Sequence, residues 1–244
     1  MAGSLFPPMK PKVVTFDAAN TLVRVRWTPG GFALDCARES GLELGEEERA
    51  SYESLLRSRW AQYREINMLR DPERGDAFWL DLTRDWLKSI GRPMEVAARM
   101  RAVSQDLLYG PDSDLFRAFD DVIPALDLLD SHGIRLGVIS NWDYTLHRVL
   151  RALDLTGRFE YVFASLEEGI EKPDPRLFHL ALARFGARPD EAVHVGDDPI
   201  DDFRGAQDAG IHAFLIDRRH QESRGSILAT LLDLGPSLGL ASSD

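Results

Sequence analysis

Four polar segments of the sequence each follow a short apolar run, and their side chains include carboxylates, a hydroxyl, an amide and a lysine. The segments are Asp17-Ala18-Ala19-Asn20-Thr21, Ser140-Asn141-Trp142-Asp143, Lys172-Pro173-Asp174-Pro175 and Gly196-Asp197-Asp198-Pro199-Ile200-Asp201-Asp202. A single carboxylate at such a place is usually a turn former or a helix cap. Four such segments in chain order are hard to explain as independent coincidences. Together they predict a binding or catalytic site at which these polar groups meet.

The apolar runs before these segments have the composition of strands buried in a parallel sheet. β-Branched and aromatic residues fill 13–16, and similar runs recur at 134–139, 161–164, 192–195 and 212–216. Helical patterns occupy 122–131, 144–153, 176–185 and 202–209. This alternation predicts an α/β fold with a doubly wound, Rossmann-like parallel sheet. Ligands bind beyond the carboxyl ends of such strands, so the four polar segments should meet at one edge.

A long helical stretch separates the first predicted strand from the others. Apolar residues three and four apart mark helices at 32–39, 46–66, 77–89 and 94–108. We therefore expect a discontinuous α/β core over residues 1–24 and 111–244, and an inserted all-helical cap domain over residues 25–110. The chain after Gly235 is expected to fray.

Linkers near residues 24–28 and 110–114 would let this cap close over the site, exclude water and select the substrate. Trp27, Arg24, Arg26 and Tyr63 are candidates for that selection. The competing interpretation is that they cover the core or face solvent, as Arg and Trp on amphipathic helices more often do.

The composition limits the partners of the protein and its location. The 244 residues include 40 acidic and 29 basic side chains, a formal charge of −11, which argues against broad attachment to nucleic acid or an anionic membrane. No apolar run of about 18 residues occurs, and Met1 to Lys12 have no apolar signal-like stretch, so neither a membrane span nor export is expected. The single cysteine, Cys36, is interpreted as a buried hydrophobe and fits a cytoplasmic protein. Monomer and homodimer both stay open.

The polar segments resemble the four motifs of the haloacid dehalogenase-like (HAD) hydrolase superfamily across the whole core. The resemblance is strongest in Ser140-Asn141 with an aromatic residue and Asp143, in Lys172-Pro173-Asp174-Pro175, and in Val195-Gly196-Asp197 through Gly205-Ala206 and Ala209-Gly210. These are similar to the helical-cap subgroup that includes the REG-2-like and HAD-like hydrolase domain-containing proteins. Most family members of known chemistry are magnesium-dependent phosphatases. The resemblance therefore implies a small phosphorylated metabolite as substrate and Mg²⁺ as cofactor.

The resemblance assigns the nucleophile and the metal ligands. Asp17 would attack phosphorus and form an aspartyl-phosphate, which water then hydrolyses. Mg²⁺ prefers oxygen ligands, and it would take Asp17, the backbone carbonyl of Ala19, Asp197 and the substrate phosphate. Thr21 belongs to the same motif as a supporting residue.

The remaining motif residues would bind phosphate or support those that do. Lys172 would steady the Asp17 carboxylate and bind a phosphoryl oxygen. Ser140, Asn141 and the helix N-terminus after them would donate hydrogen bonds to the other phosphate oxygens. Asp201 or Asp202 would hold the metal waters or orient Lys172.

Position 19 departs from the pattern of the family's phosphatases. They carry an aspartate there, which protonates the leaving alkoxide and then activates water. Ala19 cannot transfer a proton, and such help is worth about 10²–10⁴ in rate. Turnover should be slow, confined to good leaving groups such as aryl phosphates, or dependent on an acid from the cap or the substrate. Asn20 stands where glycine is usual and tolerates left-handed backbone geometry. His194 falls inside a predicted strand and should be a packed core histidine.

Three other functions stay open. Haloacid dehalogenases expel a halide, which needs no proton, but their fourth motif usually lacks the acidic cluster kept here. Phosphonoacetaldehyde hydrolases carry alanine at this position, but they use a cap lysine, and Lys88 is the only lysine of the insertion. A non-catalytic protein that binds a phosphorylated ligand or a protein partner is the third.

Overall fold

The core of the protein is a parallel sheet of six strands. The computed structural model describes residues 11–220 and 222–240. The strand order is β5-β4-β1-β6-β7-β8, and every neighbouring pair is parallel. The strands are β1 (Val13–Phe16), β4 (Arg135–Ser140), β5 (Tyr161–Ala164), β6 (Ala192–Gly196), β7 (His212–Ile216) and β8 (Ile227–Leu228). The predicted α/β sheet is confirmed, and β8 is a strand that the sequence patterns did not indicate.

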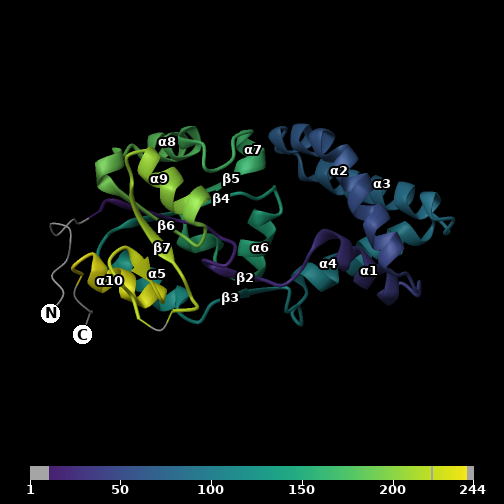
Figure 1. Cartoon of the computed structure of the whole chain (residues 1–244), viewed down its shortest axis with the longest axis horizontal. Coiled ribbons are helices and arrows are strands. Elements are labelled where there is room, and N and C mark those ends of the chain that lie inside the picture. Colours follow the sequence, from purple (N-terminus) through teal and green to yellow (C-terminus); the bar gives the residue numbers. More distant parts are fainter. Residues whose placement is uncertain (1–10, 221, 241–244) are drawn as a thin grey trace.

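Helices cover both faces of this sheet (Figure 1). One apolar cluster packs α5 (Val122–Ser131), α6 (Leu146–Ala152) and α10 (Leu234–Ser237) on the sheet, through side chains such as Leu126 and Leu150. The other packs α8 (Pro175–Phe185) and α9 (Gly205–Asp208), with Phe178 among its fully buried members. The shorter turns are α7 (Ser165–Glu168), η1 (Thr156–Arg158), η2 (Pro189–Glu191), η3 (Pro199–Arg204) and η4 (Leu231–Asp233).

Four helices form a third apolar cluster that extends away from the sheet (Figure 1). They are α1 (Pro29–Glu39), α2 (Glu46–Met68), α3 (Pro72–Ser89) and α4 (Val96–Tyr109). Tyr63, Leu82 and Trp86 lie at the centre of this cluster and are fully buried. Helix α3 begins at Pro72 rather than near residue 77, because the Asp71 carboxylate accepts from Glu73 N and Arg74 N and caps it.

Polar contacts join these helices to the core. The Tyr63 hydroxyl donates to Asp143 at 2.7 Å, and the Tyr144 backbone N–H donates to Asn67 at 3.0 Å. Asp76 of α3 accepts from Arg148 of α6 at 2.8 and 2.9 Å. The loops after β4 therefore hold the helices in place.

Short strands lie at or next to both places where the chain passes between the core and the helices. Strand β2 (Val23–Val25) pairs antiparallel with β3 (Phe116–Ala118), and Val25 lies opposite Phe116. The predicted linker at 24–28 overlaps β2 at residues 24 and 25, and the predicted linker at 110–114 ends before β3 begins at Phe116. Strands of three residues leave too short an alternating pattern to be recognised in a sequence.

The described part of the C-terminal segment is ordered, so the expectation of fraying after Gly235 is wrong as far as residue 240. Leu234 and Leu238 are buried against the same apolar cluster as α5. Residues 241–244 lie outside the described residues, as do residues 1–10 with Pro7 and Pro8. Cys36 is 4% exposed, which confirms its interpretation as a buried residue. In the described ranges, no helix is both apolar enough and long enough to cross a membrane.

Candidate active site

The carboxyl ends of three neighbouring strands bring the site together. Phe16 of β1 pairs with Val138 of β4 and with Val195 of β6. Asp17 therefore leaves β1 between Ser140, the last residue of β4, and Gly196, the last residue of β6. This is the edge of the sheet at which the sequence analysis predicts that the polar segments meet.

Lys172 is the centre of this cluster. Its ammonium donates to Asp17 Oδ1 at 2.6 Å, to the Ile139 carbonyl at 3.0 Å and to Asp202 Oδ1. The Ser140 hydroxyl donates to the same Asp17 oxygen at 2.9 Å. Lys172 is 4% exposed, so its ammonium is buried among these acceptors. In the described chain, no hydrogen bond from another residue reaches Asp17 Oδ2, while Oδ1 is held by two donors.

Burial and neighbouring charges shift the pKa of each ionisable group in this cluster. Burial alone would lower the pKa of Lys172, but Asp17 and Asp202 outweigh burial and hold that pKa above its ordinary value. Burial raises the pKa of Asp17, aided by the Asp202 charge and opposed by Lys172. Burial also acts to raise the pKa of Asp202, but Lys172 and His194 hold it below its usual range. One buried cation therefore serves two carboxylates.

Asp202, rather than Asp201, is the acid that faces Lys172. Asp198 caps the η3 turn by accepting from Ile200 N at 2.7 Å and Asp201 N at 2.8 Å. The turn then directs the Asp202 carboxylate back under the sheet edge, where Oδ2 accepts from Asp198 N at 3.0 Å. A Cβ at Gly196 would collide with that carboxylate, so only glycine fits there.

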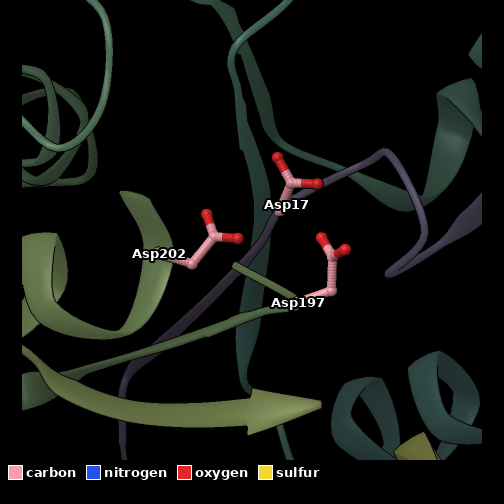
Figure 2. A group of neighbouring side chains, drawn as sticks. All are labelled: Asp17, Asp197 and Asp202. Atoms are coloured by element: carbon pink, nitrogen blue, oxygen red, sulfur yellow. The ribbon is translucent and has the colours of Figure 1, made fainter. Parts of the chain in front are cut away.

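Asp17, Asp197 and Asp202 form the acidic group of the site, with one ligand atom from each lying within 4.8 Å of the others (Figure 2). Burial and the charges of Asp17 and Asp202 raise the pKa of Asp197 to about 7. A surplus of negative charge on hard oxygen donors suits a divalent cation. Since both Asp202 oxygens already accept hydrogen bonds, the donors best placed for a cation are Asp17 and Asp197.

Asn141 holds the loop that carries Lys172. Its Oδ1 accepts from Lys172 N at 2.8 Å, and its Nδ2 donates to the Lys172 carbonyl at 2.9 Å and to Asp201 Oδ2 at 3.1 Å. Both amide hydrogens thus have acceptors in this geometry. The expected role of Asn141 as a donor to phosphate stays a prediction, and its observed contacts position Lys172 and Asp201.

His194 is fully buried, which confirms the expected core histidine, but it also contacts the site. Its ring lies 2.9 Å from the Thr15 hydroxyl through Nδ1 and 3.2 Å from Asp202 Oδ1 through Nε2. Burial lowers the pKa of His194 and favours the neutral ring. A carboxylate only accepts, so Nε2 carries the proton and Nδ1 accepts from Thr15. His194 thereby orients Asp202.

The loop after β1 is fastened by a residue that sequence reasoning missed. Asn20 adopts φ +54°, and Arg218 donates to the Asn20 carbonyl at 3.4 Å and to the Thr21 carbonyl at 2.7 Å. Asp121 accepts from the same guanidinium at 2.8 and 3.1 Å. Arg218 lies two residues after the end of β7. A search for polar residues just after each predicted strand would therefore have identified it. Thr21 is buried, and its hydroxyl has no partner within the described chain.

Arg218→Gln is expected to lower the free energy of unfolding by about 2 kcal/mol, because it leaves Asp121 without its bidentate partner and frees the loop after β1. The measurement is urea denaturation of Arg218→Gln, Asp121→Asn and the double variant. Coupled effects are expected because the two groups share one contact. Additive effects would show that the pair does not stabilise the fold jointly.

Two cavities have Trp27 in their lining, one next to Ala19 and Asn141 and one between the helical cluster and Tyr144, and none of the other three candidates for substrate selection lines either of them. Arg24 lies over the Phe119 ring at 5.0 Å, and Arg26 pairs with Asp114 at 3.7 Å. Tyr63 is buried in the helical cluster. Trp27 therefore stays a candidate for substrate selection, since it lines a cavity next to the site.

The model of the haloacid dehalogenase-like hydrolases matches residues 11–210 of the sequence. The chain belongs to this family of hydrolases, as its motifs indicated. The acidic cluster lies at the carboxyl edge of a parallel sheet, where the sequence analysis expects the motif residues to meet.

Two curated proteins and one solved structure illustrate what the chain is similar to. The human haloacid dehalogenase-like hydrolase domain-containing protein 3 is 31% identical over 211 residues, which are 84% of this chain and 81% of that protein. A protein of Methanothermobacter thermautotrophicus named glyceraldehyde 3-phosphate phosphatase is 35% identical over 245 residues, covering 91% of this chain and 96% of that protein. The crystal structure of a 2-haloacid dehalogenase from Pseudomonas syringae has a TM-score of 0.65 and 26% identity, and covers 94% of this chain and 98% of that one.

Proposed function

We propose that this hydrolase is a magnesium-dependent phosphatase that acts on a small phosphorylated metabolite through an aspartyl-phosphate on Asp17. The geometry of Asp17 carries the proposal. Ser140 and Lys172 fix Oδ1, and Oδ2 is left without a donor, as a carboxylate needs for in-line attack on phosphorus. The similar archaeal protein named as a phosphatase supports the same chemistry.

The residues of this chain divide the work. Asp17 Oδ2 forms a bond to phosphorus as the bond to the leaving oxygen breaks, and water then cleaves the aspartyl-phosphate to restore the carboxylate. Lys172 stabilises Asp17 and the phosphoryl oxygens in a desolvated site. Asp17, the Ala19 carbonyl and Asp197 would hold Mg²⁺, which when bound supplies positive charge against the phosphate. Asp202 and His194 keep Lys172 in place.

The same proposal includes a cap domain over residues 25–110, built from α1 to α4, that covers the site and excludes bulk water. A cytoplasmic location is part of it, since the single cysteine is buried and forms no disulfide.

Dehalogenation is the second candidate, since a dehalogenase shares the fold and a halide needs no proton from position 19. Its substrate is a carboxylate. The charged residues of the cavity beside Ala19 are Asp143 and Glu171, which would repel that substrate. A phosphonatase is not favoured either, because Lys88 is exposed near the end of α3 and lines neither of the two cavities that contain Trp27.

Removal of the metal tests the proposal. Hydrolysis of para-nitrophenyl phosphate is expected to fall at least about 100-fold in a chelator and to recover with added Mg²⁺, because phosphoryl transfer needs charge compensation that Lys172 alone does not give. Acid quenching during turnover, followed by peptide mass spectrometry, should locate one phosphoryl group on Asp17. Equal rates with and without chelator would contradict the magnesium requirement. Mg²⁺ binding without turnover would favour the non-catalytic alternative.

A further inference from the structure

A cavity of about 300 Å³ lies beside the proposed nucleophile and has aromatic walls. Ala19 and Asn141 belong to its lining, so it adjoins the site. Trp27, Trp60 and Trp142 supply large aromatic surfaces from three different segments of the chain. Such surfaces bind flat apolar groups well.

Two of the aromatic walls, Trp142 and Trp27, pack against the Phe116 ring. Phe116 contacts Trp142 at 5.6 Å and Trp27 at 6.3 Å between ring centroids. The Trp142 indole N–H donates to the Thr145 hydroxyl at 3.0 Å, which fixes its ring. The Trp27 Nε1 atom is buried and has no hydrogen-bond partner in the described ranges.

The charged groups of the cavity disfavour a second anion on the substrate. Its lining contains two acids, Asp143 and Glu171, and neither Lys nor Arg among the described residues. The nearby Arg64 already pairs with Glu171 at 3.0 Å. Asp143 accepts hydrogen bonds from the Tyr63 hydroxyl and from Thr145 N at 2.8 Å. A carboxylate or second phosphate on the leaving group would therefore find acids and no free cation.

The residue at position 19 imposes a separate chemical condition. Without a carboxyl group there, position 19 supplies no proton to the leaving oxygen. An alkoxide is a poor leaving group, since its conjugate acid is about as weak an acid as water, pKa about 15.7. A phenoxide leaves far more readily, because a phenol such as tyrosine has a pKa of about 10. The methyl group of Ala19 also adds apolar surface to the cavity.

From these two independent features we infer that the substrate is a phosphate monoester of a phenol whose ring carries no further negative charge. This inference rests on the proposed function and specifies its substrate class. The ring lies among the three tryptophans, and the phosphate faces Asp17. The Asp17–phosphorus bond forms as the phosphorus–phenoxide bond breaks, and the phenoxide takes its proton from water. Water then releases inorganic phosphate and restores Asp17.

A matched set of esters tests the inference. Phenyl phosphate and benzyl phosphate both present a ring, but only the first releases a phenoxide. We expect kcat/KM for phenyl phosphate to exceed that for benzyl phosphate at least about 100-fold, and 4-carboxyphenyl phosphate to have a KM at least about tenfold higher than phenyl phosphate. Equal rates for phenyl and benzyl phosphate would overturn the inference, since another group, such as Asp143, would then supply the proton.

Acetyl phosphate separates this inference from the proposed function, because it has a good leaving group and no ring. If no ester in the set, acetyl phosphate included, is hydrolysed in Mg²⁺, the proposed function fails. If acetyl phosphate is hydrolysed but phenyl phosphate is not preferred to benzyl phosphate, only the inference fails.

Two variants sharpen the test. Trp60→Ala removes a wall that is 40% exposed, so folding should be little affected, and it should raise the KM of phenyl phosphate about tenfold more than that of acetyl phosphate. Leu69→Ala, at an exposed residue outside the cavity, is the matched control and should change neither constant. Ala19→Asp should raise kcat for benzyl phosphate at least about tenfold and change phenyl phosphate less. Equal gains for both esters would show that protonation is not what limits the substrate range.

Discussion

Asp17→Asn is expected to lower kcat for para-nitrophenyl phosphate by on the order of 10⁴-fold or more, down to the background rate. The amide has nearly the shape of the carboxylate, and its oxygen can still accept from Ser140 and Lys172. It lacks the free anionic oxygen that attacks phosphorus. Because burial disfavours the Asp17 charge, the free energy of unfolding of the variant should lie within about 1 kcal/mol of that of the parent protein. Activity and stability therefore separate in this variant, and steady-state rates with urea denaturation measure both.

The control for this variant is Asp120→Asn at an exposed aspartate, which should leave the rate unchanged. Phosphoryl-enzyme should be absent from Asp17→Asn in acid-quench experiments. Turnover that persists in Asp17→Asn would mean that another group attacks phosphorus, and the aspartyl-phosphate mechanism would have to be abandoned.

Lys172→Met is expected to damage both the fold and the reaction. Two buried carboxylates, Asp17 and Asp202, lose the cation they share, and breaking a buried ion pair costs about 3–5 kcal/mol. The rate should fall on the order of 10³-fold, because the phosphoryl oxygens lose a positioned charge in a desolvated site. Urea denaturation and steady-state kinetics in Mg²⁺ are the measurements.

The pH dependence of stability adds a signature for Lys172. Its pKa is raised in the folded protein, so its contribution is fully present below the unfolded-state value of about 10.4 and is lost as the pH rises through the folded value. The difference in unfolding free energy between the parent and Lys172→Met should therefore shrink in alkaline solution. Lys88→Met removes an exposed lysine and should show no such difference. If Lys172→Met lowered the free energy of unfolding by no more than Lys88→Met at every pH, the arrangement of one cation shared by two carboxylates would be contradicted.

The topology of the sheet made most of the site predictable. Consecutive buried strands with helices between them leave few arrangements, and in each of them Asp17, Ser140 and Gly196 leave the sheet at the same edge. Lys172 could be placed there only through its motif, since nothing in its local sequence announces a buried ammonium. Its burial became evident from the contacts it makes with two acids.

Other features depend on geometry that a sequence does not reveal. Asp201 and Asp202 are chemically identical neighbours, and the η3 turn that directs Asp202 inward decides between them. The sequence predicts the Asn141 amide as a phosphate donor and does not indicate its contacts with the Lys172 backbone, which depend on how two loops meet in space. Arg218 and Asp121 are far apart in the chain, so their pairing depends on tertiary structure.

The antiparallel pair β2 and β3 also bears on how the chain reaches its native state. Strand β1 pairs with β4 only after the whole helical segment has been bridged, and closing so long a flexible loop costs entropy that grows with its length. Val25 and Phe116 are cross-strand neighbours, so the two ends of the helical segment lie side by side. Once this segment has folded, the loop that must still close between β1 and β4 is much shorter. Helices form from local contacts and are fast. Early formation of α1 to α4 would therefore shorten the search by which the central strands of the sheet find one another.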